Sequence, residues 1–327
     1  GLRRPPAEDG DETGREREFS YTSPAVVKAG RVVAGGWVQR GYVNGALRCH
    51  DLRTGTLLWE TLLSGFQMEQ TMFGEMAREP FAGAILEEDG IVYYLNQGGV
   101  VAAVDLLSGR VRWLATYDTI EVVATFSPNP ELRDLSWGPN PLLLLGNVLL
   151  LTPRDSEHLH AIDTGMGPGG AANGGKILWR YTPSVNGSGQ AELRDLLGCH
   201  RGFLYFTGPG DIVNGPGEVV ALDLTSLDAH GLLAGGGPPR KLPPLRVEGP
   251  IPGPGVLTSS GVLLSDEDGL QLVSFDLGEV RPVSTGSYRP SEGGSYPGRL
   301  QVSSGLVYMT SRHLLSAYAS SAAPKPH

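Results

Sequence analysis

Short apolar segments recur along the chain, and each begins directly after a glycine. A second apolar segment precedes each glycine, for example Pro24–Val27 before Gly30 and Ala84–Leu86 before Gly90. Two apolar runs joined by a glycine-containing turn predict a β-hairpin, because glycine readily takes the positive φ that tight hairpin turns need. The expected hairpins are centred on Gly30, Gly90, Gly146, Gly202, Gly261 and Gly305.

A third apolar segment follows each hairpin and has the pattern apolar–x–small–x–Asp. Leu47–Asp51 and Val101–Asp105 show it in full, whereas the last copy, Leu315–Ala319, has lost the Asp. Strand alternation places the first apolar residue, the small residue and the Asp on one face. We therefore expect a neighbouring sheet to approach closely at the small residue. The remaining copies are Leu159–Asp163, Val219–Asp223 and Leu272–Asp276.

A turn and a last strand complete the repeat. The Asp can accept hydrogen bonds from turn amides, the Gly can take the left-handed conformation, and a Trp follows in the strand. The third copy carries a Gly-rich insertion, Gly165–Gly174, between its Asp and its Gly. The predicted structural motif consists of Asp51, Gly55 and Trp59, then Asp105, Gly109 and Trp113, then Asp163, Gly175 and Trp179.

Repeated units of short strands joined by turns are typical of β-propeller blades. We therefore expect an all-β protein, a β-propeller of four-stranded antiparallel blades, with about six blades visible and six to eight possible. The alternative is a β-sandwich with coincidental spacing. The expected domains are a charged N-terminal arm at residues 1–17, the propeller at 18–320 and a C-terminal tail at 321–327.

The N-terminal segment Glu18–Ser23 looks like the end of a fourth strand, similar to Trp179–Pro183. This predicts that the N-terminus completes the last blade, which lacks a fourth strand of its own. The alternatives are that the sequence is part of a longer chain, or that a divergent blade lies within a long loop.

Composition narrows the classes of partner. The chain has 47 Gly and 25 Pro, which indicates many turns, and its net charge is −9. No run of basic residues with interleaved aromatics is present, so nucleic acid is not an expected partner. The longest apolar stretch, Leu142–Leu151, is too short to span a bilayer, so no transmembrane segment is expected. Two cysteines, Cys49 and Cys199, exclude a disulfide framework and a Cys-rich zinc site.

The motif Ala/Cys-x-Asp-x-x-Thr/Ser-Gly-x-x-x-Trp occurs at Cys49–Trp59 and Ala103–Trp113, with an expanded copy at Ala161–Trp179. It resembles the tryptophan-docking repeat of PQQ-like, or quinoprotein-type, β-propellers, and the resemblance covers roughly Glu18 to Ser320. That family includes quinoprotein alcohol dehydrogenases and the propeller lipoprotein of the outer-membrane barrel assembly machinery. The chain resembles the lipoprotein, which binds proteins without a cofactor, more than the dehydrogenases.

The resemblance to dehydrogenases implies a quinone held by a pair of adjacent cysteines, a stacking Trp and a calcium ion. This chain has no adjacent cysteines and no Cys-x-x-Cys-His haem motif. An enzymatic role is therefore disfavoured, and no catalytic or cofactor-binding residue is assigned. A quinone- or metal-dependent enzyme with its site in the central channel is the alternative.

Two places could hold a metal ion. His158 and His160 share one face of a predicted strand, and Asp266–Gly269 is an acidic turn whose oxygens could bind calcium. The simpler interpretations are a turn leading into a strand and an acidic hairpin tip. We expect no cofactor and treat calcium as the one possible ion. The loop Gly208–Gly217 is Gly-rich but lacks the Lys and the following helix of a phosphate-binding loop.

Long insertions are the candidate binding surface. Met-rich apolar surfaces adapt to partners, and loops on rigid scaffolds commonly carry binding. The alternative is that these side chains pack over the propeller as a small helix. We expect a non-catalytic protein-binding or scaffolding module in the bacterial periplasm, cell envelope or extracellular space. The candidate partner-binding residues are Phe66, Met68, Met72, Phe73 and Trp137.

Overall fold

The computed structural model is an all-β protein. Within the described part of the chain there is no α-helix, and the one helical element is a 3₁₀ turn at Ala171–Asn173. No described helix is long and apolar enough to cross a membrane. The predicted arm at 1–17 and tail at 321–327 lie outside the described residues. The structure describes residues 19–40, 42–66, 83–120, 137, 140–168, 170–184, 193–208, 217–247, 251, 253–265, 270–275, 280–282, 299–303, 306–310 and 315–319.

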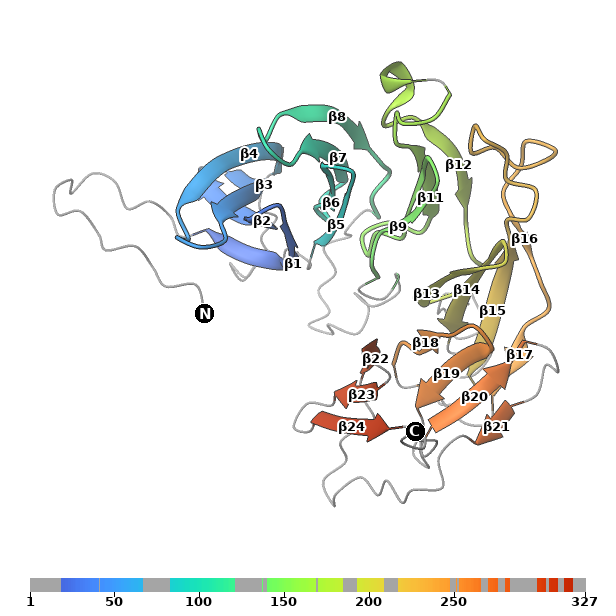
Figure 1. Ribbon diagram of the computed structural model, residues 1–327. Coiled ribbons are helices and arrows are strands. Elements are labelled where there is room, and N and C mark those ends of the chain that lie inside the picture. Colours follow the sequence, from blue (N-terminus) through green and yellow to red (C-terminus); the bar gives the residue numbers. More distant parts are fainter. Residues whose placement is uncertain are drawn as a thin grey trace, which may run out of the picture. The chain divides into compact units, whose positions relative to one another are not determined.

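The chain forms two compact units, Gly1–Thr182 with Asp228–Leu232, and Pro183–Leu227 with Leu233–His327. The first unit contains three consecutive four-stranded antiparallel sheets, coloured blue to green in Figure 1. The strands of each sheet follow one another in sequence, as in the blades of a β-propeller. Their bounds are β1 (Ser20–Lys28), β2 (Arg31–Arg40), β3 (Tyr42–Asp51) and β4 (Leu57–Phe66), then β5 (Ala84–Glu88), β6 (Ile91–Leu95), β7 (Val100–Asp105) and β8 (Val111–Thr116), then β9 (Leu143–Leu145), β10 (Val148–Leu151), β11 (Leu159–Asp163) and β12 (Ile177–Tyr181).

The second unit contains the remaining three sheets. In the fourth sheet two short strands, β16 and β17, both pair with β15, and in the last sheet three strands are described. The predicted hairpins and small-residue strands are present as paired antiparallel strands in both units. The bounds are β13 (Asp195–His200), β14 (Phe203–Gly208), β15 (Glu218–Asp223), β16 (Arg240–Lys241) and β17 (Leu245–Arg246), then β18 (Val256–Leu257), β19 (Gly261–Ser265), β20 (Leu270–Ser274) and β21 (Val280–Pro282), then β22 (Arg299–Ser303), β23 (Leu306–Thr310) and β24 (Leu315–Ala319).

The hairpin glycines have the expected positive φ at four positions. The φ values are +72° at Gly30, +76° at Gly90, +59° at Gly146 and +80° at Gly202. The prediction was wrong for Gly261, which starts β19 without a positive φ. A Cβ at Gly261 would lie 2.2 Å from the carbonyl oxygen of Val273, so close strand approach explains this glycine instead. Gly305 lies outside the described residues.

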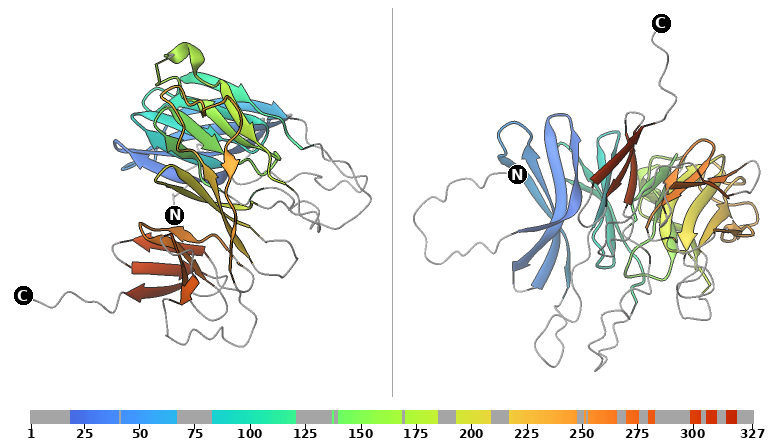
Figure 2. Two further views of the ribbon diagram at one scale, coloured as in Figure 1. Left: turned by 90° about the vertical axis from the view of Figure 1, so that its right-hand side faces the viewer. Right: turned by 90° about the horizontal axis from the view of Figure 1, so that it is seen from below.

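The N-terminal segment belongs to the first sheet. Ser20 and Tyr21 pair with Trp37 and Gly36 of β2, and β1 continues after a bulge to Lys28. The prediction that Glu18–Ser23 completes the last blade was therefore wrong for the residues that are described. The strands of this first sheet remain side by side in both views of Figure 2.

The hydrophobic core of each unit lies between neighbouring sheets. Tyr94 of β6 shows how closely the first two sheets pack, because a Cβ at Gly35 of β2 would lie 2.1 Å from the Tyr94 ring. The contact between the second and third sheets includes Tyr93, Trp113, Leu149 and Ile162. In the second unit, Val219 packs with Val262 and Leu264, and Leu263 with Leu270 and Leu300.

Candidate functional site

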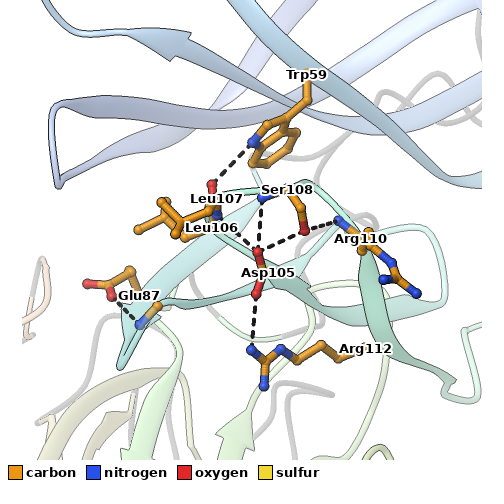
Figure 3. Close-up of polar contacts among 9 residues, drawn as sticks. Trp59, Glu87, Asp105, Leu106, Leu107, Ser108, Arg110 and Arg112 are labelled. Atoms are coloured by element: carbon orange, nitrogen blue, oxygen red, sulfur yellow. Dashed lines mark hydrogen bonds and ion pairs between the residues drawn. The ribbon is translucent and has the colours of Figure 1, made fainter.

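The turn after Asp105 shows the chemistry of the repeat in full (Figure 3). Its Oδ1 accepts hydrogen bonds from the backbone N–H of Leu107 at 3.1 Å and of Ser108 at 2.9 Å, and from the Ser108 hydroxyl at 2.8 Å. Its Oδ2 accepts from the Arg112 guanidinium at 3.0 Å. Hydrogen bonds from Ser108 and Arg112 lower the pKa of Asp105 from 3.8 to about 2. The ionised carboxylate therefore fixes the turn between β7 and β8.

Equivalent aspartates act in the same way in the other sheets. Asp51 accepts from the backbone of Arg53 and from both donors of Thr54, and these bonds lower its pKa. Asp163 accepts from the Gly165 N–H at 2.7 Å, so the Gly-rich insertion starts from the same contact. The glycines that end the three turns have φ values of +73°, +71° and +85°, at Gly55, Gly109 and Gly175.

Trp59 connects the first sheet to the turn of the second. Its indole N–H donates to the carbonyl of Leu106 at 3.1 Å, and the N–H of Leu106 donates to the carbonyl of Gly90 in its own sheet. The Thr61 hydroxyl donates to the carbonyl of Gly109 at 2.6 Å. Figure 3 shows the indole lying over this turn. One residue, Leu106, thus bonds both to its own hairpin and to the preceding sheet.

Trp113 makes the same connection between the second and third sheets. Its indole N–H donates to the carbonyl of Thr164 at 2.8 Å, and the Thr164 N–H donates to the carbonyl of Asn147. A Cβ at Gly174 would lie 2.4 Å from the Trp113 ring, and one at Gly175 would lie 3.1 Å away. Glycines are required here because the indole packs directly on the backbone.

Trp179 departs from this pattern. Its indole N–H donates at 3.0 Å to the carbonyl of Gly231, in the segment Asp228–Leu232 that belongs to the first unit. Asp228 accepts hydrogen bonds from the N–H groups of His230 and Leu232, which fixes this short loop. A loop later in the chain therefore provides the acceptor for Trp179.

Each of the three Trp residues stands opposite the small residue of the third strand. The pairs are Trp59 with Cys49, Trp113 with Ala103, and Trp179 with Ala161. The residue before each Trp is an extra, unpaired residue, which forms a β-bulge in the fourth strand. In the second sheet this residue is Arg112, which reaches Asp105. The bulge residues are Leu58, Arg112 and Leu178.

The candidate partner-binding residues are mostly beyond what the structure describes. Met68, Met72 and Phe73, and the side chain of Phe66, lie outside the described part of the chain. Trp137 is described and is only 2% exposed. It packs in the interior, so a partner-binding surface cannot be built on it.

A buried polar network missed by sequence reasoning lies beside the third sheet. Ser156 and His160 are fully buried, and the Ser156 Oγ lies 3.1 Å from the His160 Nε2. The Nδ1 of His160 is buried, and no described residue forms a hydrogen bond with it. Burial, and then the charges of His158 and Arg180, lower the pKa of His160 from 6.5 to about 4. His160 is therefore neutral near pH 7.

The neighbouring groups brace this network rather than complete a catalytic triad. The Tyr117 hydroxyl donates to Asp155 Oδ1 at 2.9 Å, and the Gly99 N–H donates to Asp155 Oδ2 at 3.2 Å. A triad needs a carboxylate on the second ring nitrogen of the His and an accessible Ser hydroxyl. Here Asp155 bonds to Tyr117 and Gly99, which flank strands β8 and β7, and Ser156 is out of contact with solvent.

The candidate metal ligands find different partners. The Nδ1 of His158 lies 2.8 Å from the hydroxyl of Thr182, while His160 faces Ser156, and the two rings stand at 82°. Across the described ranges, no three His, Cys, Asp or Glu side chains gather as a metal site would require. The turn Asp266–Gly269 lies outside the described residues. Cys49 in β3 and Cys199 in β13 are both free thiols, whose pKa values burial raises.

Comparisons with known proteins relate the chain to others by structure. No family model matches the sequence, and no curated protein matches it. BamB from Moraxella catarrhalis matches with a TM-score of 0.46 and 15% identity, over 92% of this chain and 77% of that one.

Two further solved structures match with higher TM-scores. The computationally designed Ika8 protein gives a TM-score of 0.53 at 14% identity, over 93% of this chain and 72% of that one. The quinohemoprotein alcohol dehydrogenase from Comamonas testosteroni gives 0.50 at 12% identity, and the match covers 91% of this chain and 57% of the dehydrogenase. At these identities the likeness concerns the fold alone, and that fold is the β-propeller.

Proposed function

We propose that the chain is a non-catalytic, partner-binding β-propeller. The observation that carries this proposal is a group of exposed aliphatic side chains on the outer strands of the first two sheets. Each is between 43% and 49% exposed, although its strand also contributes a Trp to the packing between sheets. The group consists of Leu57, Leu58 and Leu62 of β4 and Val111 and Leu114 of β8.

Strands β4 and β8 are edge strands as well as apolar ones. Each pairs on one side only, with β3 and β7 respectively, within the described sheets. The free edge of a sheet can pair with an extended segment of another protein, and exposed aliphatic side chains beside it add apolar contact. The proposed occupant is therefore an extended, apolar segment of a partner protein that pairs along β4.

The side chains that could do chemistry are buried, bound within turns or far apart in the sequence, which supports a non-catalytic role. The Ser156–His160 pair is fully buried, and the aspartates of the turns are held by turn donors. Cys49 and Cys199 lie in separate sheets and are not the adjacent pair that the quinone-dependent alternative implies. No observation in the described residues favours a quinone- or metal-dependent enzyme over a binding protein.

The proposal extends to location and to the long insertions. A bacterial envelope or extracellular site suits the repeat family that the motif resembles. Phe66 is the last residue of β4, and Met68, Met72 and Phe73 follow it in sequence, so these residues would add to a partner contact that begins on that strand.

Site-specific photo-crosslinking tests the proposal. A photoreactive amino acid at Leu62 or Leu114 should capture one and the same protein in the cells that make this chain. Val302, an equally exposed aliphatic residue of the last sheet, is the matched control position. With the captured protein purified, Leu58→Asp/Leu62→Asp should weaken binding at least about tenfold. Equal capture at Val302, or unchanged affinity of the double variant, would contradict it.

A further inference from the structure

A pocket of about 310 Å³ lies between the second and third sheets of the first unit. One wall is the β5–β6 hairpin with Ile91 and Tyr93, and the other includes Leu144 of β9 and Met166 of the Gly-rich insertion. Thr164, the acceptor of the Trp113 indole, also lines it. The walls are therefore partly apolar and partly polar, and they are positioned by the same contact that joins the two sheets.

Two carboxylates, Glu88 and Asp89, complete the lining. Both are exposed, and within the described residues neither side chain has a hydrogen-bond or ion-pair partner. The adjacent Glu87 differs, because its carboxylate accepts from the Gly90 N–H at 2.9 Å and pairs with Lys28 at 3.2 Å. The hairpin therefore uses one of its three consecutive acidic residues for folding and leaves two beside the pocket.

Arg112, a cation near Tyr93, is occupied by another carboxylate. Arg112 is close enough to influence Tyr93, but its guanidinium is bound to Asp105 at 3.0 Å. Tyr93 is 1% exposed, and burial raises its pKa, so this residue adds no negative charge beside the pocket. Among the described residues that line the pocket, Glu88 and Asp89 are the charged ones, so the charge of the lining is negative.

We infer that this pocket binds the side chain of a lysine from a protein partner. A lysine has an aliphatic stem and a charged head, and such side chains bury the stem on apolar surface while the ammonium stays at the rim. Here the stem would lie against Leu144 and Met166. The ammonium would reach Glu88 and Asp89 and form charge-assisted hydrogen bonds. The inference rests on the proposed partner-binding function and names one side chain of that partner.

A titration with a small probe tests the pocket without the partner. The probe is Nα-acetyl-lysine methylamide, and the reporter is the methyl resonance of Met166 in protein labelled at its methionine methyl groups. Met166→Leu assigns the resonance among the five methionines. The lysine probe should shift the Met166 signal saturably, whereas the uncharged norleucine analogue should not.

Variants separate charge from fold. Glu88→Gln/Asp89→Asn should weaken the lysine probe about tenfold, as expected for the loss of charge-assisted bonds. Glu157→Gln removes an exposed carboxylate outside the pocket and should leave binding unchanged. Both pocket residues are exposed, and Asn tolerates the φ of +50° at position 89, so the variant should fold. Rising salt should weaken the wild-type interaction as a second measurement.

Three results would overturn the inference: no saturable shift, an equal shift with norleucine, or undiminished binding by the double variant. Such a result would leave the crosslinks at Leu62 and Leu114 intact. Conversely, the absence of those crosslinks would contradict the proposed function but would not change the result of the lysine titration.

Discussion

Trp59 occupies the space that a side chain at Gly109 would need. A Cβ at Gly109 would lie 2.7 Å from the indole Cδ2, and the φ of Gly109 is +71°. Gly55 holds the same place in the first sheet with a φ of +73°, yet nothing described lies within 4 Å of its Cβ position. The two glycines share a backbone conformation and differ in the indole contact.

Alanine substitution at both positions should separate these effects. Gly55→Ala should cost about 1–2 kcal/mol, the penalty of a left-handed conformation for a residue with a Cβ. Gly109→Ala should cost about 1–3 kcal/mol more, because the indole must move. Denaturant unfolding of the full chain measures both free energies. Equal losses would show that Trp59 does not press on the turn, and a Trp59→Ala background should remove the difference.

Removing the indole donor alone should also destabilise the fold. Trp113→Phe keeps an aromatic ring but leaves the carbonyl of Thr164 without its donor at 2.8 Å. Because that carbonyl is buried, we expect a loss of about 1–3 kcal/mol in the free energy of unfolding. Trp37→Phe is the control, since the Trp37 indole has no hydrogen bond within the described residues. A loss at Trp113 no larger than at Trp37 would contradict the expectation.

Acid should release the turn that Asp105 holds. Its pKa is about 2 in the folded chain and 3.8 as the ordinary value, so its ionised form stabilises the fold above pH 3.8. That contribution should fade as the pH falls from 3.8 towards 2. Asp105→Asn should flatten the pH dependence of unfolding in this window, with Glu157→Gln as control. Parallel curves for the wild type and Asp105→Asn would disprove the role.

His160 should make the fold sensitive to a milder range of pH. Its pKa falls from 6.5 to about 4 on folding, because the buried ring resists protonation. The unfolded chain therefore gains a proton first, and stability should fall as the pH drops from 6.5 towards 4. His160→Gln should remove this slope although it lowers stability overall. His230→Gln, at an exposed position, should keep the slope of stability against pH. If His230→Gln also removed this slope, the slope would not come from His160.

Local turn chemistry explains why much of the fold was predictable. An Asp that accepts from the next few amides and a Gly with positive φ act within one short segment, so Asp105 and Gly109 carry their signal in the sequence. The same holds for the hairpins at Gly30 and Gly90. The prediction of a positive φ failed at Gly261 because this glycine is needed for a close approach to Val273 on the neighbouring strand.

Features that depend on distant residues could not be predicted. The bulge at Arg112 leaves no mark in the spacing from Gly to Trp, since an extra residue is visible only against its partner strand. The Ser156–His160 network depends on burial by other segments, which the sequence does not report. The place of Trp137 in a long insertion predicts a binding role, but its side chain is buried by other segments.

The Trp179–Gly231 bond means that the first unit is not one continuous stretch of sequence. Its last indole acceptor is synthesised well after Thr182, once the strands β13 to β15 of the second unit have already been made. During translation, therefore, the Trp179 indole of the third sheet cannot form its hydrogen bond to Gly231 until part of the second unit has been synthesised. A polypeptide cut after Thr182 would contain all three sheets of this unit and still lack the loop that secures the third.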